Sequence, residues 1–160
     1  MTIKVGDKIP QVNLFTMGAK GPEQLGTDAI FGGKKVVLFA VPGAFTPTCS
    51  NAHVPGFVVN ADALKAKGVD TIACLSVNDA FVMGAWGENQ NADQLLMLAD
   101  GNGEFTQAVG LTLDGSGFGL GERSLRYAMI VEDGTVKVLN VEASAGELET
   151  SSAEAMLAAL

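Results

Sequence analysis

The stretch Pro42–Ser50, with the sequence PGAFTPTCS, joins a predicted strand to a predicted helix. The apolar run KVVLFAV at 35–41 precedes it and is typical of a strand buried on both faces. A helix is predicted to begin within the stretch, at residue 46 or 47, and to continue to about residue 67. This order places Cys49 on the first turn of the helix, just after a buried strand.

The predicted helix has signals at both ends and one interruption. Its apolar residues recur at intervals of three and four, at Val54, Phe57, Val58, Ala61 and Leu64. Thr46 is a suitable N-cap, and Pro47 fits the first helical position, where a missing N–H is not needed. Lys67 lies in the last turn, where a positive charge is favourable. Because Pro55 cannot donate to the preceding turn, we expect a kink or a break near His53.

Cys49 combines several features of a reactive thiol. The first turn of a helix has N–H groups without intrahelical acceptors and carries the positive end of the helix dipole, and both stabilise a thiolate. Pro42 and Pro47 stiffen the chain on either side, and the Thr46 hydroxyl can point at the sulfur or at an incoming oxygen. The alternative is a buried cysteine that acts as a small apolar residue. Position and neighbours favour the reactive thiol.

Composition argues against several classes of protein. The 160 residues suffice for one domain with a substantial core, and 48% hydrophobic with 18% charged residues argues against a disordered chain. The net charge of −8 disfavours nucleic acid and anionic membrane surfaces as partners. No signal or transit peptide is visible, and no apolar run reaches the roughly 20 residues that span a bilayer. We expect a soluble, cytoplasmic protein, unless a targeting segment has been removed from a mature form.

The remaining segments predict a sheet with helices between its strands. Strands are expected at 11–16, 69–77, 95–99, 126–131 and 135–141, helices at 79–88, 104–109 and from 152 onward, and a glycine-rich loop at 114–121. Ser76 or Asn78 is expected to cap the helix at 79–88. The alternating middle of the chain implies parallel strands, and the turn at Asp133-Gly134 implies an antiparallel hairpin. The predicted fold class is α/β, with a central mixed β-sheet flanked by helices on both faces, in a single domain over 1–160.

The Cys49 stretch also resembles the active-site motif of a known family. Pro-x-x-x-Thr-x-x-Cys fits Pro42, Thr46 and Cys49 and is similar to the peroxiredoxin motif, and the full PGAFTPTCS resembles the type II (Prx5-like) branch. Supporting similarities are HVPGF at 53–57, SVND at 76–79 and NVE at 140–142. The resemblance implies a thioredoxin-like fold and a thiol-dependent peroxidase that reduces hydrogen peroxide and alkyl hydroperoxides through a Cys49 sulfenic acid. It also implies a homodimer and no metal or organic cofactor.

The family's active-site residues map onto three positions around Cys49. Thr46 would orient the peroxide and the sulfur, Pro42 would screen the site from water, and Arg126 would stabilise negative charge on the leaving oxygen. Arg126 is the matching position because RYAM at 126–129 resembles the family's strand that bears its arginine. The alternatives are that Arg126 is an ordinary surface arginine or that Arg123 supplies the charge.

Two other residues of reactive type are expected to be structural. Cys74 lies within a predicted strand among apolar neighbours, which indicates a buried, inert thiol. His53 is expected to form hydrogen bonds near the active-site helix or at a subunit contact, because Cys–His pairs usually take the base from a separate element. A metal site built from Cys49, His53 and Cys74 would lack a fourth ligand at a suitable spacing.

The C-terminal region bears on how the sulfenic acid is reduced. Some Prx5-like proteins carry a resolving cysteine there, whereas GELETSS at 146–152 has none. The pattern resembles the members with a single catalytic cysteine, which are reduced by glutathione, glutaredoxin or another external thiol such as thioredoxin. The alternative is a thioredoxin-like redox sensor or chaperone whose Cys49 reacts without steady-state turnover.

Three phenylalanines are candidates for either a dimer contact or the core: Phe45, Phe81 and Phe118.

Overall fold

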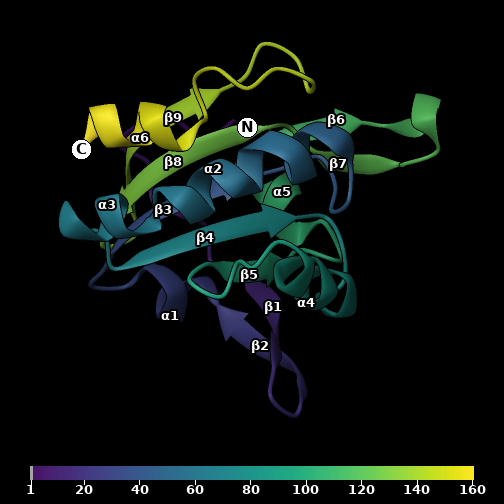
Figure 1. Ribbon diagram of the computed structural model, residues 1–160, viewed down its shortest axis with the longest axis horizontal. Helices are drawn as coiled ribbons and strands as arrows, with labels where there is room; N and C mark the ends of the chain where they lie inside the picture. Colours follow the sequence, from purple (N-terminus) through teal and green to yellow (C-terminus); the bar gives the residue numbers. More distant parts are fainter. Residues whose placement is uncertain (1) are drawn as a thin grey trace.

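The computed structural model describes residues 2–160 of the protein. Its centre is a seven-stranded sheet (Figure 1). The strand order is β2-β1-β5-β4-β3-β8-β9. These strands are β1 (Asn13–Gly18), β2 (Gly21–Gly26), β3 (Lys35–Ala40), β4 (Thr71–Ser76), β5 (Leu96–Ala99), β8 (Tyr127–Glu132) and β9 (Thr135–Val141). Neighbours β3, β4 and β5 are parallel, and the outer pairings are antiparallel. The predicted mixed sheet is therefore confirmed.

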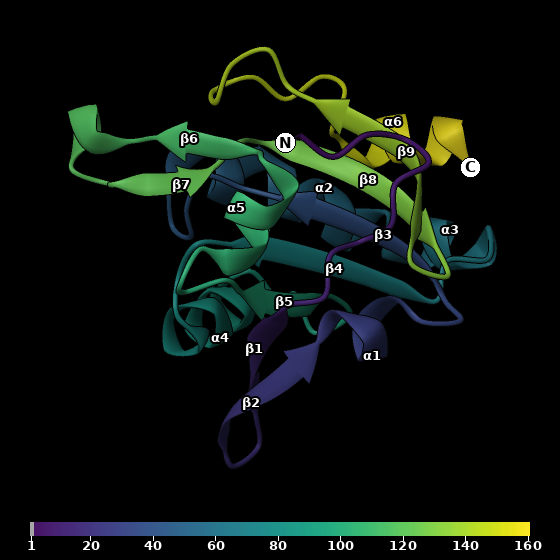
Figure 2. The same cartoon turned by 180° about the vertical axis from the view of Figure 1, so that it is seen from behind.

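Helices cover both faces of this sheet, as the two opposite views show (Figures 1 and 2). One face carries α2 (Val54–Val59), α3 (Ala61–Ala66), α4 (Ala80–Asn89) and α6 (Ala153–Ala159), and the other carries α1 (Thr27–Phe31) and α5 (Glu104–Val109). Alternate residues of β3 divide between the two cores: Val37 and Phe39 pack under α2, whereas Val36 and Leu38 pack under α1 and α5. Among the described residues, no helix is long and apolar enough to span a bilayer.

The predicted helix over 46–67 is present but is divided at two points, of which only the one near His53 was expected. It contains a π-helical turn, Cys49–His53, followed by α2 and, after a break at Asn60, by α3. Pro55 has no N–H for the preceding turn, and the wider π-turn accommodates this. The expected irregularity near His53 is this change from π- to α-helix. Asn60 leaves the helical region, with φ −96° and ψ 8°, and its side-chain amide donates to the Gly56 carbonyl over 2.8 Å.

Other sequence-based boundaries need smaller corrections. The helix α4 is capped by Asp79, whose carboxylate accepts from Val82 N–H at 2.8 Å, rather than by Ser76 or Asn78. Strand β2 and helix α1 were not predicted. Arg126 directly precedes β8 instead of beginning it. The predicted glycine-rich loop is the tip of a two-stranded ribbon, β6 (Thr112–Asp114) and β7 (Glu122–Ser124), joined by a short 3₁₀ turn at Ser116–Phe118. This ribbon projects from the body of the molecule (Figure 1).

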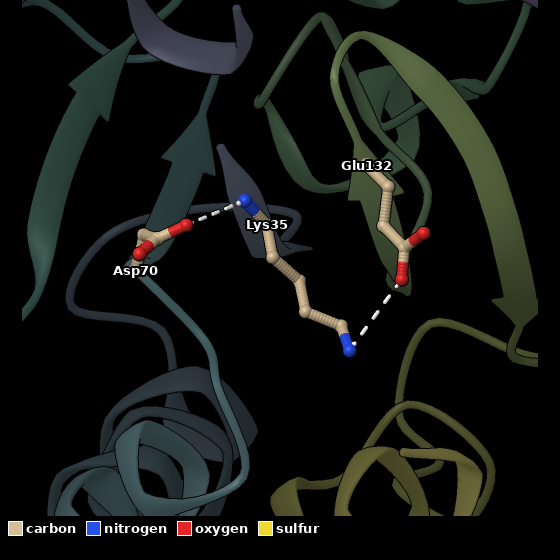
Figure 3. A network of polar contacts seen from close by, with 3 residues as sticks. All are labelled: Lys35, Asp70 and Glu132. Atoms are coloured by element: carbon tan, nitrogen blue, oxygen red, sulfur yellow. Dashed lines mark hydrogen bonds and ion pairs between the residues drawn. The ribbon is translucent and has the colours of Figure 1, made fainter. Parts of the chain in front are cut away.

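The end of β3 farthest from Cys49 is fixed by Lys35 (Figure 3). Its backbone N–H donates to the Asp70 carboxylate at 2.8 Å, and its Nζ lies 3.4 Å from Glu132 Oε1. A partly exposed ion pair of this kind contributes only about 0–1 kcal/mol, so it adds little to stability. Strand β3 pairs in parallel with β4 and antiparallel with β8, and this pairing sets which residues meet at its opposite end.

Candidate active site

The register of β3 against β8 brings two distant parts of the chain together. The last paired residues are Ala40 and Tyr127, so Arg126 lies beside the point where β3 ends and the loop to Cys49 begins. Pro42, the first proline of the motif, is buried at this junction. Sheet pairing therefore places Arg126 next to a cysteine that is 77 residues away along the chain.

Cys49 is fully buried on the first turn of the helical segment. The earliest backbone hydrogen bond of this segment joins Ser50 N–H to the Thr46 carbonyl at 2.9 Å. The N–H of Cys49 thus belongs to the turn without intrahelical acceptors, as the sequence indicated. The following Val54 N–H closes the π-turn on the Cys49 carbonyl. Single π-turns inside helical segments are frequent at functional sites.

The Thr46 hydroxyl has two partners in this turn. Its Oγ1 lies 2.7 Å from the Gly43 carbonyl and 2.9 Å from Cys49 Sγ. A hydroxyl has a single proton, so it donates to one partner at a time. When Cys49 is a thiol, S–H can donate to Oγ1 while the hydroxyl donates to Gly43. When Cys49 is a thiolate, the hydroxyl can donate to sulfur.

Arg126 uses all three of its guanidinium nitrogens. Nη2 donates to Cys49 Sγ at 3.1 Å, Nε donates to the Ala145 carbonyl at 3.0 Å, and Nη1 lies 2.8 Å from His53 Nδ1. Its side chain is 2% exposed, so it is not the surface arginine of the alternative interpretation. The competing Arg123 donates its Nε–H to the Leu120 carbonyl at 2.9 Å and makes no hydrogen bond to the sulfur. A permanent positive charge therefore lies against the cysteine, and both side chains are buried.

His53 forms part of the active-site network and is not paired with the sulfur. Arginine can only donate, so His53 Nδ1 must accept and Nε2 must carry the proton, which is donated to the Ser151 carbonyl at 2.9 Å. Burial and then the charge of Arg126 lower the pKa of His53 from 6.5 to about 3. The imidazole is therefore neutral near physiological pH, as a structural role requires.

A pocket of about 370 Å³ opens beside Cys49. The motif contributes Pro42, Thr46, Pro47 and Thr48, the β6–β7 ribbon contributes Leu113, Phe118 and Leu120, and Arg126, Ala145 and Gly146 complete much of the wall. The ribbon thus forms an apolar side of the entrance. A larger pocket of about 620 Å³ lies between β1, α4 and β5, but no cysteine, histidine or arginine lines it.

Several supporting residues were not identified by sequence reasoning. Asn78 Oδ1 accepts from Ala44 N–H at 3.0 Å and from the Ser76 hydroxyl at 2.6 Å, so it fixes the motif loop to the end of β4. Trp86 Nε1 donates to the Ser50 hydroxyl at 3.0 Å. The only available signals were a polar SVND immediately after an apolar strand and a single tryptophan in the neighbouring helix.

Cys74 is fully buried in β4, and burial raises the pKa of its thiol well above the ordinary value. A neutral thiol without solvent contact is a poor nucleophile. The geometry thus agrees with an inert role. Within residues 2–160, no group of three or more histidine, cysteine, aspartate or glutamate residues has the arrangement of a metal site.

Comparison with known families gives a match over nearly the whole chain. The family model described as Redoxin matches residues 4–157. Peroxiredoxin-2E, chloroplastic, of Arabidopsis thaliana is 51% identical over 164 residues, covering 99% of this chain and 70% of that protein. Peroxiredoxin-2B of the same plant is 49% identical over 162 residues, covering 99% and 98%.

Solved structures give the same result. Reduced Prx3 in complex with H₂O₂ from Vibrio vulnificus superposes with a TM-score of 0.95 at 57% identity, covering 99% of both chains. Peroxiredoxin 5 from Alvinella pompejana superposes with a TM-score of 0.86 at 38% identity, covering 98% of this chain and 96% of that one. The expected thioredoxin-like arrangement of sheet and helices is confirmed by these neighbours.

Proposed function

Because the chain belongs to the Redoxin family and is a peroxiredoxin of the type II (Prx5-like) branch, and hence a thiol peroxidase, we propose that Cys49 is its peroxide-reducing sulfur. One observation carries this assignment: Thr46 Oγ1 and Arg126 Nη2 both lie within hydrogen-bond distance of Cys49 Sγ, at 2.9 and 3.1 Å. Two converging donors stabilise a thiolate, and no similar pair surrounds Cys74 in the described part of the chain.

The first half of the reaction transfers one oxygen to sulfur. The Cys49 thiolate attacks the near oxygen of a hydroperoxide, the S–O bond forms, and the O–O bond breaks. Sulfur is oxidised by two electrons, and the peroxide is reduced to water or an alcohol after its leaving oxygen takes a proton. Arg126 and Thr46 supply the donors that stabilise the developing negative charge, and buried Pro42 limits the access of water.

The second half needs a thiol from another molecule. Its sulfur attacks the Cys49 sulfenic acid, a mixed disulfide forms, and water leaves; a second thiol then releases Cys49 and becomes part of a disulfide. Full burial of Cys74 and the absence of cysteine from 146–152 support an external donor. The proposed donor is glutathione, glutaredoxin or thioredoxin. Dependence on such a donor also supports a reducing, cytoplasmic location, which cell fractionation with an antibody would test.

A homodimer with contacts near the active-site loops is also proposed. Phe45, Phe81 and Phe118 are 53%, 67% and 89% exposed, although phenylalanine is usually buried in folded proteins. Phe45 lies in the motif loop and Phe118 at the tip of the ribbon. Analytical ultracentrifugation of the parent and of Phe45→Ser, Phe81→Ser and Phe118→Ser tests this. A monomeric parent would contradict the dimer.

A donor panel tests the peroxidase assignment. Hydrogen peroxide is held fixed, and its consumption is followed with glutathione, glutathione plus glutaredoxin, and thioredoxin with its reductase. Turnover is expected with at least one donor and is lost in Cys49→Ser. A single equivalent of peroxide consumed without turnover by any donor would instead indicate a redox sensor or chaperone. Consumption unchanged in Cys49→Ser would contradict the assignment.

A further inference from the structure

Arg126 holds its charge in the interior without a carboxylate at ion-pair distance. The sole ion pair among residues 2–160 is Lys35–Glu132, at the far end of β3. A buried guanidinium requires fixed acceptors, since every unsatisfied N–H is costly there. Two of its acceptors are the Ala145 carbonyl and His53 Nδ1. The position of Nη2 against Cys49 therefore depends on how well those two acceptors are held.

His53 can accept from Arg126 only while its proton stays on Nε2. The Ser151 carbonyl, 2.9 Å away, accepts that proton and so fixes both the tautomer and the angle of the ring. Aromatic packing supports the same ring orientation, since the tilted rings of Phe39 and Phe57 lie against the imidazole with centroid distances of 4.8 and 5.7 Å. The acceptor for Arg126 is thus set by the position of the Ser151 backbone.

Ser151 is held in turn by the carboxylate of Glu142. Glu142 Oε2 accepts from Ser151 N–H at 2.7 Å, from the Ser151 hydroxyl at 2.5 Å and from Glu149 N–H at 3.0 Å. Burial opposes the charged form of this carboxylate, but the hydrogen bonds from Ser151 and Glu149 outweigh it and hold the pKa of Glu142 below its ordinary value. The carboxylate is ionised at neutral pH and orders the turn before α6.

The 142–152 segment contacts Arg126 directly at two points, one on its backbone and one on its side chain. Its first residue, Glu142, donates its N–H to the Arg126 carbonyl at 3.0 Å, and Ala145 accepts from Arg126 Nε. In Figure 1 this segment is the yellow loop between β9 and α6, outside the sheet. A loop in this position has few apolar contacts to define it, so its internal hydrogen bonds decide its conformation.

We propose that Glu142 is a positioning residue for the active site: it fixes Ser151, which orients His53, which holds the Arg126 guanidinium against the Cys49 sulfur. The inference rests on the proposed function, because it assigns Arg126 a role at that sulfur. It assigns to Glu142, in the 142–152 segment, an influence on the reacting atoms that passes through several intervening residues. A change in Glu142 therefore alters Cys49 without touching it.

Reach and charge can be separated at position 142. Glu142→Asp keeps the charge but is one methylene shorter, so its oxygen does not reach Ser151. Glu142→Gln removes the charge but keeps an amide oxygen at the same reach, and all three short hydrogen bonds converge on one oxygen. If Glu142 acts by position, Asp is damaging and Gln is tolerated. If Glu142 acts only by its charge, the Glu142→Gln variant is damaged and the Glu142→Asp variant is tolerated.

The test measures Cys49 reactivity without turnover. The rate of iodoacetamide alkylation and the ultraviolet absorbance of the thiolate are recorded at neutral pH. A Cys74→Ala background is used, so that both signals come from Cys49 alone. Because misplacing a catalytic group by about 1 Å costs about a hundredfold, we expect Glu142→Asp and Ser151→Ala to slow alkylation about tenfold or more and to lower the thiolate absorbance. Glu142→Gln should stay within about threefold of the parent. The matched control is Glu147→Gln, which removes an equal charge from an exposed side chain of the same segment.

A double-mutant cycle excludes a general loss of structure. In an Arg126→Gln background the guanidinium is gone, so Glu142→Asp should have almost no further effect on alkylation, and the two changes should be strongly non-additive. Near-ultraviolet circular dichroism checks that each variant is folded, and the milder Ser151→Ala serves if Glu142→Asp is not. Additive effects, parent-like rates in both Glu142→Asp and Ser151→Ala, or a defect in Gln without one in Asp would overturn the proposal. If the protein shows the expected effects on alkylation, and their non-additivity, but no steady-state peroxide turnover, only the proposed peroxidase cycle would be overturned.

Discussion

Arg126 and Cys49 are joined by a hydrogen bond of 3.1 Å between Nη2 and Sγ, although 77 residues separate them in the chain. The contact exists because β3 and β8 are antiparallel neighbours that end at the same edge of the sheet. Neither residue is solvent-exposed, so the interaction is little screened by water. The geometry makes the cation a fixed component of the site.

Removing this cation should slow peroxide reduction strongly. Arg126→Gln keeps a donor but loses the charge and the three-way connection, so we expect kcat/KM for hydrogen peroxide to fall about a hundredfold or more, the usual cost of one preorganised donor. Stopped-flow measurement of sulfenic acid formation gives this constant. Arg123→Gln is the control, and its value should lie close to that of the parent. Equal losses in both variants would mean that the general positive potential matters and the contact does not.

The Thr46 hydroxyl can be tested by exchanging only its oxygen. Thr46→Val preserves the shape and removes the donor to Cys49 Sγ, whereas Thr46→Ser keeps the hydroxyl. We expect Val to lower kcat/KM for peroxide about a hundredfold and Ser to retain most of it. Mixing experiments with a single turnover isolate this step from reduction by thiols. A serine variant as slow as the valine variant would show that the methyl group, and not the hydroxyl, is required.

Local sequence signals were sufficient where a segment is organised by its neighbours in the chain. The strand before Pro42, the helix Glu104–Val109 and the strand Thr135–Val141 appear where their periodicity and turns indicated. The division of the 46–67 helix was only partly visible. Pro55 marks the π-turn, but the break at Asn60 depends on a side-chain hydrogen bond to Gly56 that has no signature in periodicity. Strand β2, GPEQLG, is largely polar because it lies at the edge of the sheet, and so no apolar alternation revealed it.

The site divides in the same way. Cys49, Thr46 and Pro42 lie within eight consecutive residues, and their relation follows from a strand-to-helix junction. Arg126 was found only through a family resemblance, since its position depends on pairing between strands far apart in the chain. Asn78, Ser151 and Glu142 are further examples, because each is an ordinary polar residue in the sequence. In the fold, Asn78 bonds the motif loop, the Ser151 carbonyl accepts from His53, and Glu142 accepts from Ser151. The residues that carry the chemistry could be predicted from the sequence, but these three residues, which hold them in place, could not.

Cys74 should be dispensable for turnover. It is buried in the centre of the sheet, so forming a disulfide with Cys49 would require local unfolding of both elements. We expect Cys74→Ala and Cys74→Ser to keep steady-state peroxidase activity with glutathione plus glutaredoxin. The serine variant should unfold about 1–3 kcal/mol more easily in urea because its hydroxyl is buried among apolar side chains. A collapse of turnover in both variants, with folding intact, would make Cys74 a resolving residue.

Tyr127 offers a stabilising substitution next to the site. Its side chain is fully buried, and its hydroxyl has no hydrogen-bond partner among the described residues, while burial raises the pKa of this phenol. Because an unsatisfied buried hydroxyl costs about 1–3 kcal/mol, Tyr127→Phe should increase the free energy of unfolding by up to about 1 kcal/mol after the smaller packing loss. Urea denaturation followed by tryptophan fluorescence measures this. A loss of stability would reveal a bound water or another partner for the hydroxyl.

His53 should make the fold sensitive to acid. Its pKa is lowered from 6.5 to about 3 by burial and then by Arg126, whereas in the unfolded chain the imidazole titrates normally. Between these two values the unfolded state binds more protons than the folded state, so the free energy of unfolding rises with pH in that window. As pH falls from about 6.5 toward about 3, the protein should therefore lose stability, on the order of 1 kcal/mol for each pH unit.

His53→Gln isolates this contribution from that of the carboxylates. Glutamine at position 53 has no titrating group, and its amide oxygen can still accept from Arg126 while its NH₂ donates toward the Ser151 carbonyl. The variant is expected to be less stable than the parent at neutral pH but to have a flatter dependence on pH between the two pKa values. Glu142, whose pKa is also lowered, destabilises both proteins in acid with the same sign, so only the difference between the two curves is attributed to His53. Urea denaturation at a series of pH values gives both curves. Parallel curves would mean that His53 becomes protonated without unfolding the protein, and the neutral tautomer that accepts from Arg126 would then not be required by the fold.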